Sequence, residues 1–204
     1  MRVVVEGAAL SYGGEHPVFA GIDADFEEGR ITALVGPSGS GKTSLLSAIA
    51  GITRLTAGTV SYVDGEGQRP PARADIVWVP QGSNAIGSRS AVDNVMIGSL
   101  SNGIRPTDAR ELALAALADV GLEGRAHSPA NTLSGGELQR VGFARALASR
   151  RPVILADEPS SSLDAQNTEQ LAALLRGLST EAVVIVATHD PLLMDASDEI
   201  VRLR

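Results

Sequence analysis

Gly36-Pro37-Ser38-Gly39-Ser40-Gly41-Lys42-Thr43 decides the fold, because it fits the pattern G-x-x-x-x-G-K-[ST] at every defined position. The apolar residues 31–35 precede it and predict a buried strand, and residues 44–50, closed by Gly51, predict a helix. Glycines and small side chains let backbone N–H groups surround an anion, and a helix N-terminus adds partial positive charge. The stretch therefore predicts a phosphate-binding loop for a nucleoside triphosphate. The alternative, a glycine-rich turn with a chance lysine, does not account for this strand–loop–helix setting.

Two carboxylates follow a second apolar run at Val153-Ile154-Leu155-Ala156-Asp157-Glu158. Open α/β sheets bind ligands at the carboxyl ends of their parallel strands. Lys42 is expected to reach the terminal phosphates, and the Thr43 hydroxyl and Asp157 are expected to hold Mg²⁺. Glu158 is predicted to polarise the attacking water as a general base. The alternative for this run is a strand that simply ends in solvated acids.

Composition narrows the class of protein. The 204 residues carry a net charge of −7, with 44% hydrophobic residues, six aromatic residues and no cysteine. This length suits one domain with a substantial core. The absence of cysteine excludes disulfide scaffolds and thiol chemistry, and the acidic balance argues against nucleic-acid binding. No apolar run could cross a bilayer and no secretory pattern opens the chain, so we expect a soluble, cytoplasmic protein that can dock on a membrane partner.

Strand and helix signals alternate along most of the chain. Strands are predicted near residues 3–12, 22–26, 31–35, 59–63 and 76–79, with a polar loop around 65–71. From about Ser83 to Asn131 one amphipathic helix is predicted, capped by Thr107 and ended by Gly121. Helices over 138–149 and 165–177 then alternate with strands over 153–156 and 182–187, which indicates parallel βα units in an α/β fold.

A glycine pair begins the helix that follows Leu133. In Ser134-Gly135-Gly136-Glu137, Ser134 can cap the helix while Glu137 reaches back in a capping box. The capping box does not explain the glycines, which leave two amides bare at a helix N-terminus and suit a second phosphate contact.

With these motifs in this order, the whole chain resembles the ATP-binding cassette (ABC) transporter family. Residues 133–137 resemble the family's signature motif, continued by residues 138–140, and residues 36–43 and 153–158 resemble its two nucleotide motifs. Gln81 resembles the Q-loop glutamine, Ser161-Ser162-Leu163-Asp164 the D-loop, and His189 the switch histidine. Tyr12 stands where the family places an aromatic that stacks on adenine. A plain edge-strand aromatic remains the alternative for Tyr12, and a loop polar residue for Gln81.

The resemblance implies a P-loop NTPase fold: a mainly parallel core sheet, an N-terminal antiparallel β subdomain and a small helical insertion. It implies one ATPase domain over residues 1–204, with the core at about 1–82 and 150–204 and the insertion with the signature motif at about 83–149. It implies that ATP lies between the phosphate loop of one cassette, with Ser44 beside it, and residues 134–137 of a second copy or a homologous cassette. In that arrangement Glu158, His189, Gln81 and Lys42 are catalytic, and Gln81 joins Thr43 and Asp157 at the metal.

ATP-driven closure of such a dimer implies work on separate transmembrane permease subunits, which would hold this chain at the inner face of the membrane. The receiving surface is expected around residues 82–94, and Glu137 favours the lipoprotein-release and macrolide-export branch. Two alternatives stay open: a mechanical signalling module that moves no substrate, and a soluble cassette in translation or DNA repair. The sequence leaves open the substrate, the direction of movement, the second cassette's identity, and ATP against GTP.

Overall fold

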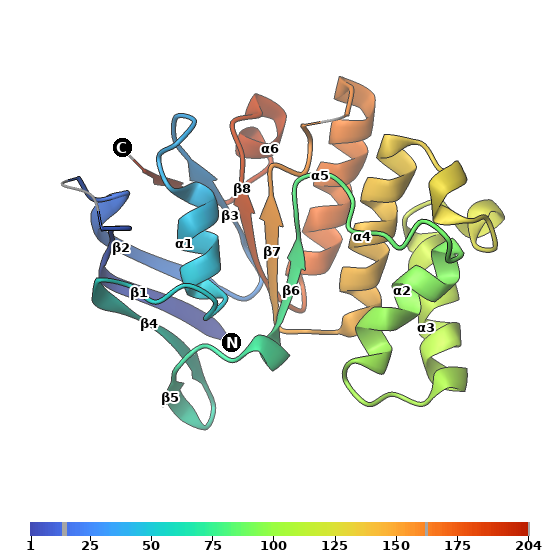
Figure 1. The fold of residues 1–204 in the computed structure, drawn as a ribbon, viewed down its shortest axis with the longest axis horizontal. Coiled ribbons are helices and arrows are strands. Elements are labelled where there is room, and N and C mark those ends of the chain that lie inside the picture. The colour runs from blue at the N-terminus through green and yellow to red at the C-terminus, as the bar shows by residue number, and fades with distance from the viewer. Residues whose placement is uncertain (14–15, 162, 204) are drawn as a thin grey trace.

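The computed structural model describes residues 1–13, 16–161 and 163–203, which form two sheets with helices packed around them (Figure 1). The larger sheet has five parallel strands in the order β6(Ile76–Val79), β7(Val153–Asp157), β8(Val183–Ala187), β3(Ile31–Val35), β9(Glu199–Arg202). Every residue of β7 and β8 is buried, as continuous apolar runs in the middle of a parallel sheet require. The mainly parallel α/β core predicted from the sequence is confirmed.

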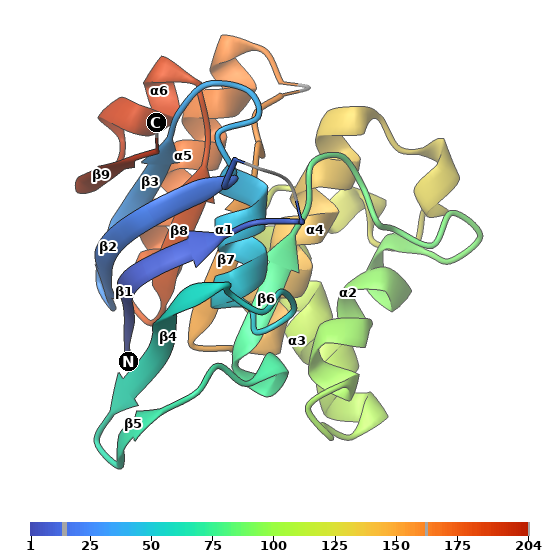
Figure 2. The ribbon, with the colours of Figure 1, turned by 60° about the vertical axis from the view of Figure 1, so that its left-hand side comes forward.

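The second sheet is antiparallel and lies on one face of the core. Its strands follow the order β2(Phe19–Glu27), β1(Arg2–Leu10), β4(Ala57–Asp64), β5(Gly67–Arg69). Helix α1(Lys42–Ile49) lies between the two sheets, and its Leu45, Leu46 and Ile49 are fully buried among residues from both (Figure 2). The helix that follows the phosphate loop is therefore held on two sides.

The remaining helices cover the opposite face and one side of the core. Helices α4(Gly135–Ser149) and α5(Ala165–Ser179) supply Phe143, Leu171 and Leu175 to a buried cluster with β7 and β8. Helices α2(Ala91–Leu100) and α3(Pro106–Asp119) pack against α4 in a third cluster. A short α6(Pro191–Asp195) precedes β9. Helix α4 thus belongs to the parallel core and to the helical part at once.

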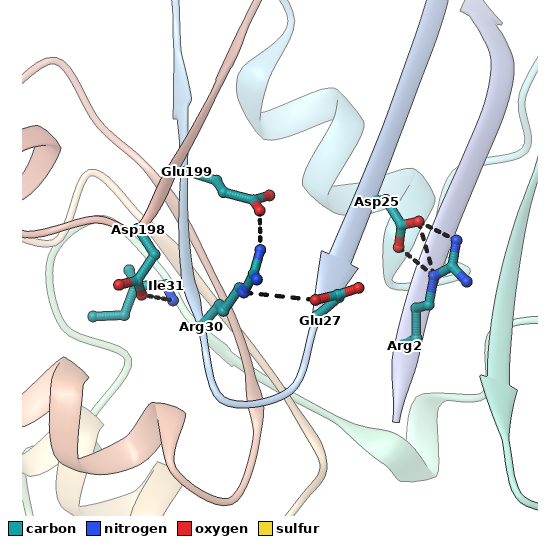
Figure 3. Close-up of polar contacts among 7 residues, drawn as sticks. All are labelled: Arg2, Asp25, Glu27, Arg30, Ile31, Asp198 and Glu199. Atoms are coloured by element: carbon teal, nitrogen blue, oxygen red, sulfur yellow. Dashed lines mark hydrogen bonds and ion pairs between the residues drawn. The ribbon is translucent and has the colours of Figure 1, made fainter.

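A polar network fastens the start of β3, the strand that carries the phosphate loop (Figure 3). Arg30 lies in the β2–β3 turn and pairs with Glu27 at 3.5 Å and with Glu199 at the start of β9. The Ile31 N–H donates to the Asp198 carboxylate at 2.8 Å. Exposed ion pairs contribute little free energy individually. We therefore infer that these contacts fix the register of β9 against β3 and add little to the stability of the sheet.

Four elements were missed or misplaced by the sequence reading. Helix α2 lies in a segment for which only one helix was predicted, β5 occupies the expected loop around 65–71, and α6 and β9 were not predicted. The predicted cap at Thr107 is wrong: α3 begins at Pro106, and its N-cap Arg105 offers no side-chain hydrogen bond. Proline favours the first helical position because its fixed φ suits the helix and its missing N–H is not needed there.

Among the glycines that the structure describes, Gly58 in β4 has the least room for a side chain. Its φ is +79°, and a Cβ there would lie 2.4 Å from the Glu6 carbonyl oxygen and from the Gly7 backbone. We expect Gly58→Ala to lower the free energy of unfolding by at least about 2 kcal/mol, through steric clash with backbone and left-handed strain. Urea unfolding followed by circular dichroism measures this. Gly65→Ala, with open space around its Cβ, is the matched control, and equal midpoints for the two variants would contradict the assignment.

Candidate functional site

Four parallel strands end at the same edge of the core sheet and deliver the predicted groups there. Gly36 follows β3, Gln81 lies two residues after β6, Glu158 follows β7, and His189 lies two residues after β8. These groups line one cleft of about 600 Å³. Its described lining residues are Val18, Gly36, Pro37, Ser38, Gly39, Gly41, Lys42, Thr43, Ser44, Gln81, Glu158 and His189. Sequence reasoning did not identify Val18, an apolar residue just before β2.

The loop before α1 is shaped to hold an anion. Gly41 is the N-cap of α1 with φ +89°, and no side chain caps the helix, so its first N–H groups stay available. A Cβ on Gly41 would meet Val18 and Phe19 at 2.8 Å, because the start of β2 packs against the loop. The buried Ser40 Oγ has no hydrogen-bond partner among the described residues. A loop with uncapped N–H groups and an orphaned hydroxyl fits a polyphosphate.

Lys42 is buried and folded back over this loop. Its Nζ donates to the carbonyl oxygens of Gly36 at 3.0 Å and Pro37 at 3.4 Å, and lies 3.5 Å from the Glu158 Oε1 atom. Only 10% of the Lys42 side chain is exposed, so this ammonium sits at the cleft wall with a fixed direction. It supplies positive charge where the helix N-terminus already favours an anion.

Glu158 is held in an unusual backbone conformation. Its φ is +45°, one of two left-handed non-glycine residues among those described, and its N–H donates to the Ala187 carbonyl oxygen at 2.8 Å. The side chain bridges two groups: Oε2 lies 2.8 Å from the His189 Nδ1 atom, and Oε1 faces Lys42. Left-handed strain of this kind gathers at functional sites. No pattern in the sequence predicts this left-handed conformation of Glu158.

Asp157 and Thr43 form the natural place for a cation. Asp157 is 6% exposed, its carboxylate interacts with the Thr43 side chain, and its Oδ1 has no partner among the described residues. Burial raises the pKa of Asp157, with Glu158 adding in the same direction, while Thr43 and Lys42 lower it. An orphaned carboxylate oxygen beside a hydroxyl matches the hard oxygen donors that Mg²⁺ prefers. Within residues 1–13, 16–161 and 163–203 no group of three or more His, Asp or Glu side chains is placed to hold a metal ion.

The capping box predicted at the start of α4 is confirmed. The Glu137 N–H donates to the Ser134 Oγ at 3.3 Å, and the Ser134 N–H donates to the Glu137 carboxylate at 2.8 Å. That second hydrogen bond is the main cause of a lowered Glu137 pKa, and Arg125 adds an ion pair at 3.2 Å. A Cβ on Gly135 would meet open space. These residues, Ser134 to Glu137, do not line the phosphate-loop cleft of their own chain.

The other predicted residues lie apart from the cleft wall. Tyr12 is 69% exposed just after β1 and does not line the cleft. In the segment 161–164, Leu163 packs within 3.4 Å of the Gly136 Cβ position and Asp164 caps α5. Ser162 lies outside the described residues. Tyr12 as a base-stacking residue, and the roles given to the other site residues, stay predictions.

Replacing the buried Asp157 should affect the stability of the protein and its activity in opposite directions. The pKa of Asp157 is raised above its usual 3.8, so its charge costs folding free energy that grows as the pH rises through and above that value. Asp157→Asn is therefore expected to unfold at a higher temperature than the parent at pH 7 without nucleotide, with a gap that shrinks near pH 3.

If Asp157 holds the metal as predicted from the sequence, Mg²⁺-dependent ATP turnover of the same variant should fall by at least about 10-fold. Asp164→Asn is the control for stability, because hydrogen bonds from Asn167 lower the pKa of Asp164 and reverse the sign. Differential scanning fluorimetry across pH measures the unfolding temperatures. A lower unfolding temperature for Asp157→Asn at pH 7 would contradict the assigned burial penalty.

Comparison with known proteins adds evidence that is independent of the geometry of the cleft. The family model described as ABC transporter matches residues 19–161. The lipoprotein-releasing system ATP-binding protein LolD of Bacteroides thetaiotaomicron is 40% identical over 212 residues, covering 98% of this chain and 96% of that protein. The phosphonates import ATP-binding protein PhnC 1 of Natronomonas pharaonis is 38% identical over 203 residues, covering 94% of this chain and 84% of that protein.

A solved structure matches over nearly the same length. It is a dimeric post-hydrolysis state of an ATP-binding cassette bound to ADP and Pi, at a TM-score of 0.86 and 30% identity. The match covers 99% of this chain and 94% of that one.

Proposed function

This chain belongs to the ABC transporter family, and from that membership and the geometry of the cleft we propose that it is the ATP-hydrolysing subunit of a transporter. It forms one ATPase domain, with the core at about residues 1–82 and 150–204 and the insertion at about 83–149. One observation carries the proposal. A phosphate loop with its lysine, a strand-end glutamate in contact with a histidine, and a glutamine from a third strand all line one cleft.

The residues divide the work of hydrolysis by their positions. Lys42 and the N–H groups before α1 bind the phosphates and offset the charge that develops in transfer. Glu158 accepts a proton from water as the water oxygen bonds to the γ-phosphorus and the bond to the leaving ADP oxygen breaks. His189 holds the Glu158 carboxylate in place through the 2.8 Å contact.

Thr43, Asp157 and Gln81 are the residues that would hold Mg²⁺, which supplies charge neutralisation on the phosphate oxygens. The Asp157 Oδ1 atom has no partner among the described residues, and this supports the assignment. Tyr12 is the residue that would stack on the base.

Two chains share each nucleotide in this proposal. The segment 134–137 does not line its own chain's cleft, and it lies at a helix N-terminus where a Cβ on Gly135 would meet open space. A second copy, or a homologous cassette, would supply this segment to the γ-phosphate in a head-to-tail dimer. ATP then favours the closed dimer because the closed form binds it better than the open form does.

Mixing two inactive variants tests this sharing. Gly135→Asp is expected to fold, since its Cβ meets open space and an acid suits a first helical turn, but its charge repels the partner's phosphate. Lys42→Ala inactivates the other half of a site. In a heterodimer of the two, one site is intact and the other carries both changes.

We therefore expect steady-state ATP hydrolysis to reappear on mixing, at about a quarter of the parent rate in an equal mixture, because about half of the dimers are then heterodimers and each of these has one intact site of two. Each variant alone at the same total concentration is the control. A mixture no more active than the separate variants, with heterodimers shown by mass spectrometry, would contradict a shared site.

A membrane partner receives the work in this proposal. No helix within residues 1–13, 16–161 and 163–203 is long and apolar enough to span a bilayer. Transmembrane permease subunits would bind at residues 82–94, beside the Q-loop, and hold the chain at the cytoplasmic face of the membrane. The similarity to LolD over 98% of this chain favours the lipoprotein-release and macrolide-export branch. Flux measured in vesicles that carry the native permease, with and without this subunit, tests transport against signalling.

A further inference from the structure

A second cavity lies between α4 and α5, outside the phosphate-loop cleft. Its volume is about 840 Å³, within the range that small-molecule sites occupy. Figure 1 shows the two helices next to each other on one side of the parallel sheet. The walls are mainly apolar, with Phe143 and Leu147 from α4 and Leu171 and Leu174 from α5. The hollow exists in part because Gly177 presents no side chain to it, and a Cβ there would meet open space.

Two residues that line this cavity each carry a buried N–H donor with no acceptor among the described residues. Gln139 lines the cavity and is only 6% exposed, yet its Nε2 has no partner. The neighbouring Arg140 donates from Nη1 to the Asn167 side chain at 3.2 Å, while its buried Nε has no partner. Leaving buried donors unmatched costs free energy, and such groups call for an acceptor from elsewhere.

The chemistry of the two donors defines what would fill the cavity. Both are N–H donors and one belongs to a guanidinium, so the complementary group is an anionic acceptor with two oxygens. The apolar walls complement a hydrocarbon body. The only acid among the described lining residues, Asp119 at the end of α3, does not pair with Arg140.

We propose that the cavity between α4 and α5 is a second binding site, which takes a small amphipathic carboxylate. The carboxylate of the ligand accepts hydrogen bonds from Gln139 and Arg140, and the hydrocarbon part of the ligand packs along Phe143 and the leucines of α5. Gly136 also lines this cavity, so a bound ligand lies against the segment assigned to the partner's nucleotide. That consequence rests on the proposed function, whereas binding itself does not.

Decanoate is the probe for this site. Decylammonium, which has a hydrocarbon chain of the same length and the opposite charge, is the comparison ligand. Isothermal titration of the purified protein is expected to show saturable binding of decanoate at one site, at least about 10-fold tighter than decylammonium. The shifts of amide resonances on titration should be largest around Gly136 and Gly177. ATP bound at the phosphate loop should not compete. Loss of ATPase activity would therefore leave this result intact, and loss of decanoate binding would leave the proposed function intact.

Two variants identify the ends of the ligand. Arg140→Gln should weaken the binding of decanoate by about 10-fold. Arg176 is exposed on α5 and does not line the cavity, so Arg176→Gln should leave the affinity for decanoate unchanged. Gly177→Leu should fill the hollow and abolish binding without lowering the unfolding temperature, and Gly124→Leu is its matched control away from the cavity.

Three results would overturn the proposal: no saturable binding at millimolar decanoate, equal affinity for the two probes, or unchanged affinity in both Arg140→Gln and Gly177→Leu. Each of the last two outcomes would identify decanoate as an adventitious additive only.

Discussion

Glu158→Gln protein is expected to bind ATP as the parent does but to hydrolyse it about 10²- to 10⁴-fold more slowly, the range that general-base catalysis contributes. Glutamine keeps the length and shape of glutamate, so the left-handed backbone at residue 158 and the packing around it should not change. What is lost is the carboxylate that accepts a proton from water. Removing the negative charge 3.5 Å from the Lys42 Nζ atom should also leave that ammonium freer for the γ-phosphate.

Slow hydrolysis should make the closed dimer visible. With MgATP the Glu158→Gln protein is expected to elute as a dimer, because the shared ligand persists, while the parent returns to monomer as ATP is consumed. Phosphate release and light scattering after size exclusion measure the two effects together. Glu169→Gln, an exposed acid on α5, is the matched control and should behave as the parent. Hydrolysis by Glu158→Gln within a factor of about three of the parent would remove Glu158 from the assigned role.

The sequence was sufficient to predict the sheet edge that carries the cleft, because that edge is built from strand ends. Apolar runs followed at once by Gly36 and by Asp157 are local signals, and a parallel sheet brings such ends together without further information. The capping box at Ser134 is likewise local, since both hydrogen bonds lie within four residues. These features were predicted correctly for the same physical reason: the interactions that define them are short in sequence.

What the sequence could not provide depends on distant partners. Helix α2 is anchored by Asn94, whose amide donates to the Ile86 carbonyl oxygen and whose backbone carbonyl accepts from Arg145 of α4. Strand β9 gains its place from pairing with β3, where the Asp198 carboxylate meets the Ile31 N–H. The strained backbone of Glu158 is set by a hydrogen bond to β8. None of these contacts leaves a periodic or spacing signal in one chain.

Lys42→Ala should lose nucleotide affinity rather than turnover alone. Lys42 is the only lysine in the chain, and the described residues that line the cleft include no arginine. Hydrogen bonds to a charged group are worth about 1.5–3 kcal/mol, so loss of the ammonium should raise the dissociation constant for ATP by up to about 100-fold. Isothermal titration at concentrations that saturate the parent should then show no measurable heat.

The single lysine also allows a test on the unchanged protein. An amine-reactive acylating reagent can modify only the α-amino group and Lys42, so intact-mass spectrometry reports the fate of both. Saturating ATP should leave modification of the α-amino group unchanged and suppress modification of Lys42, because an ammonium covered by phosphate oxygens is less accessible to the reagent.

Lys42→Arg separates charge from shape in this assignment. Lys42 reaches the carbonyl oxygens of Gly36 and Pro37 from a buried position, and a planar guanidinium is too broad for the same space. We expect Lys42→Arg to bind ATP more weakly than the parent although the charge is kept. Full affinity in Lys42→Arg together with none in Lys42→Ala would reduce the role to charge alone. Full affinity in Lys42→Ala would show that the loop does not grip the phosphates through this residue, and the proposed hydrolytic site would fail with it.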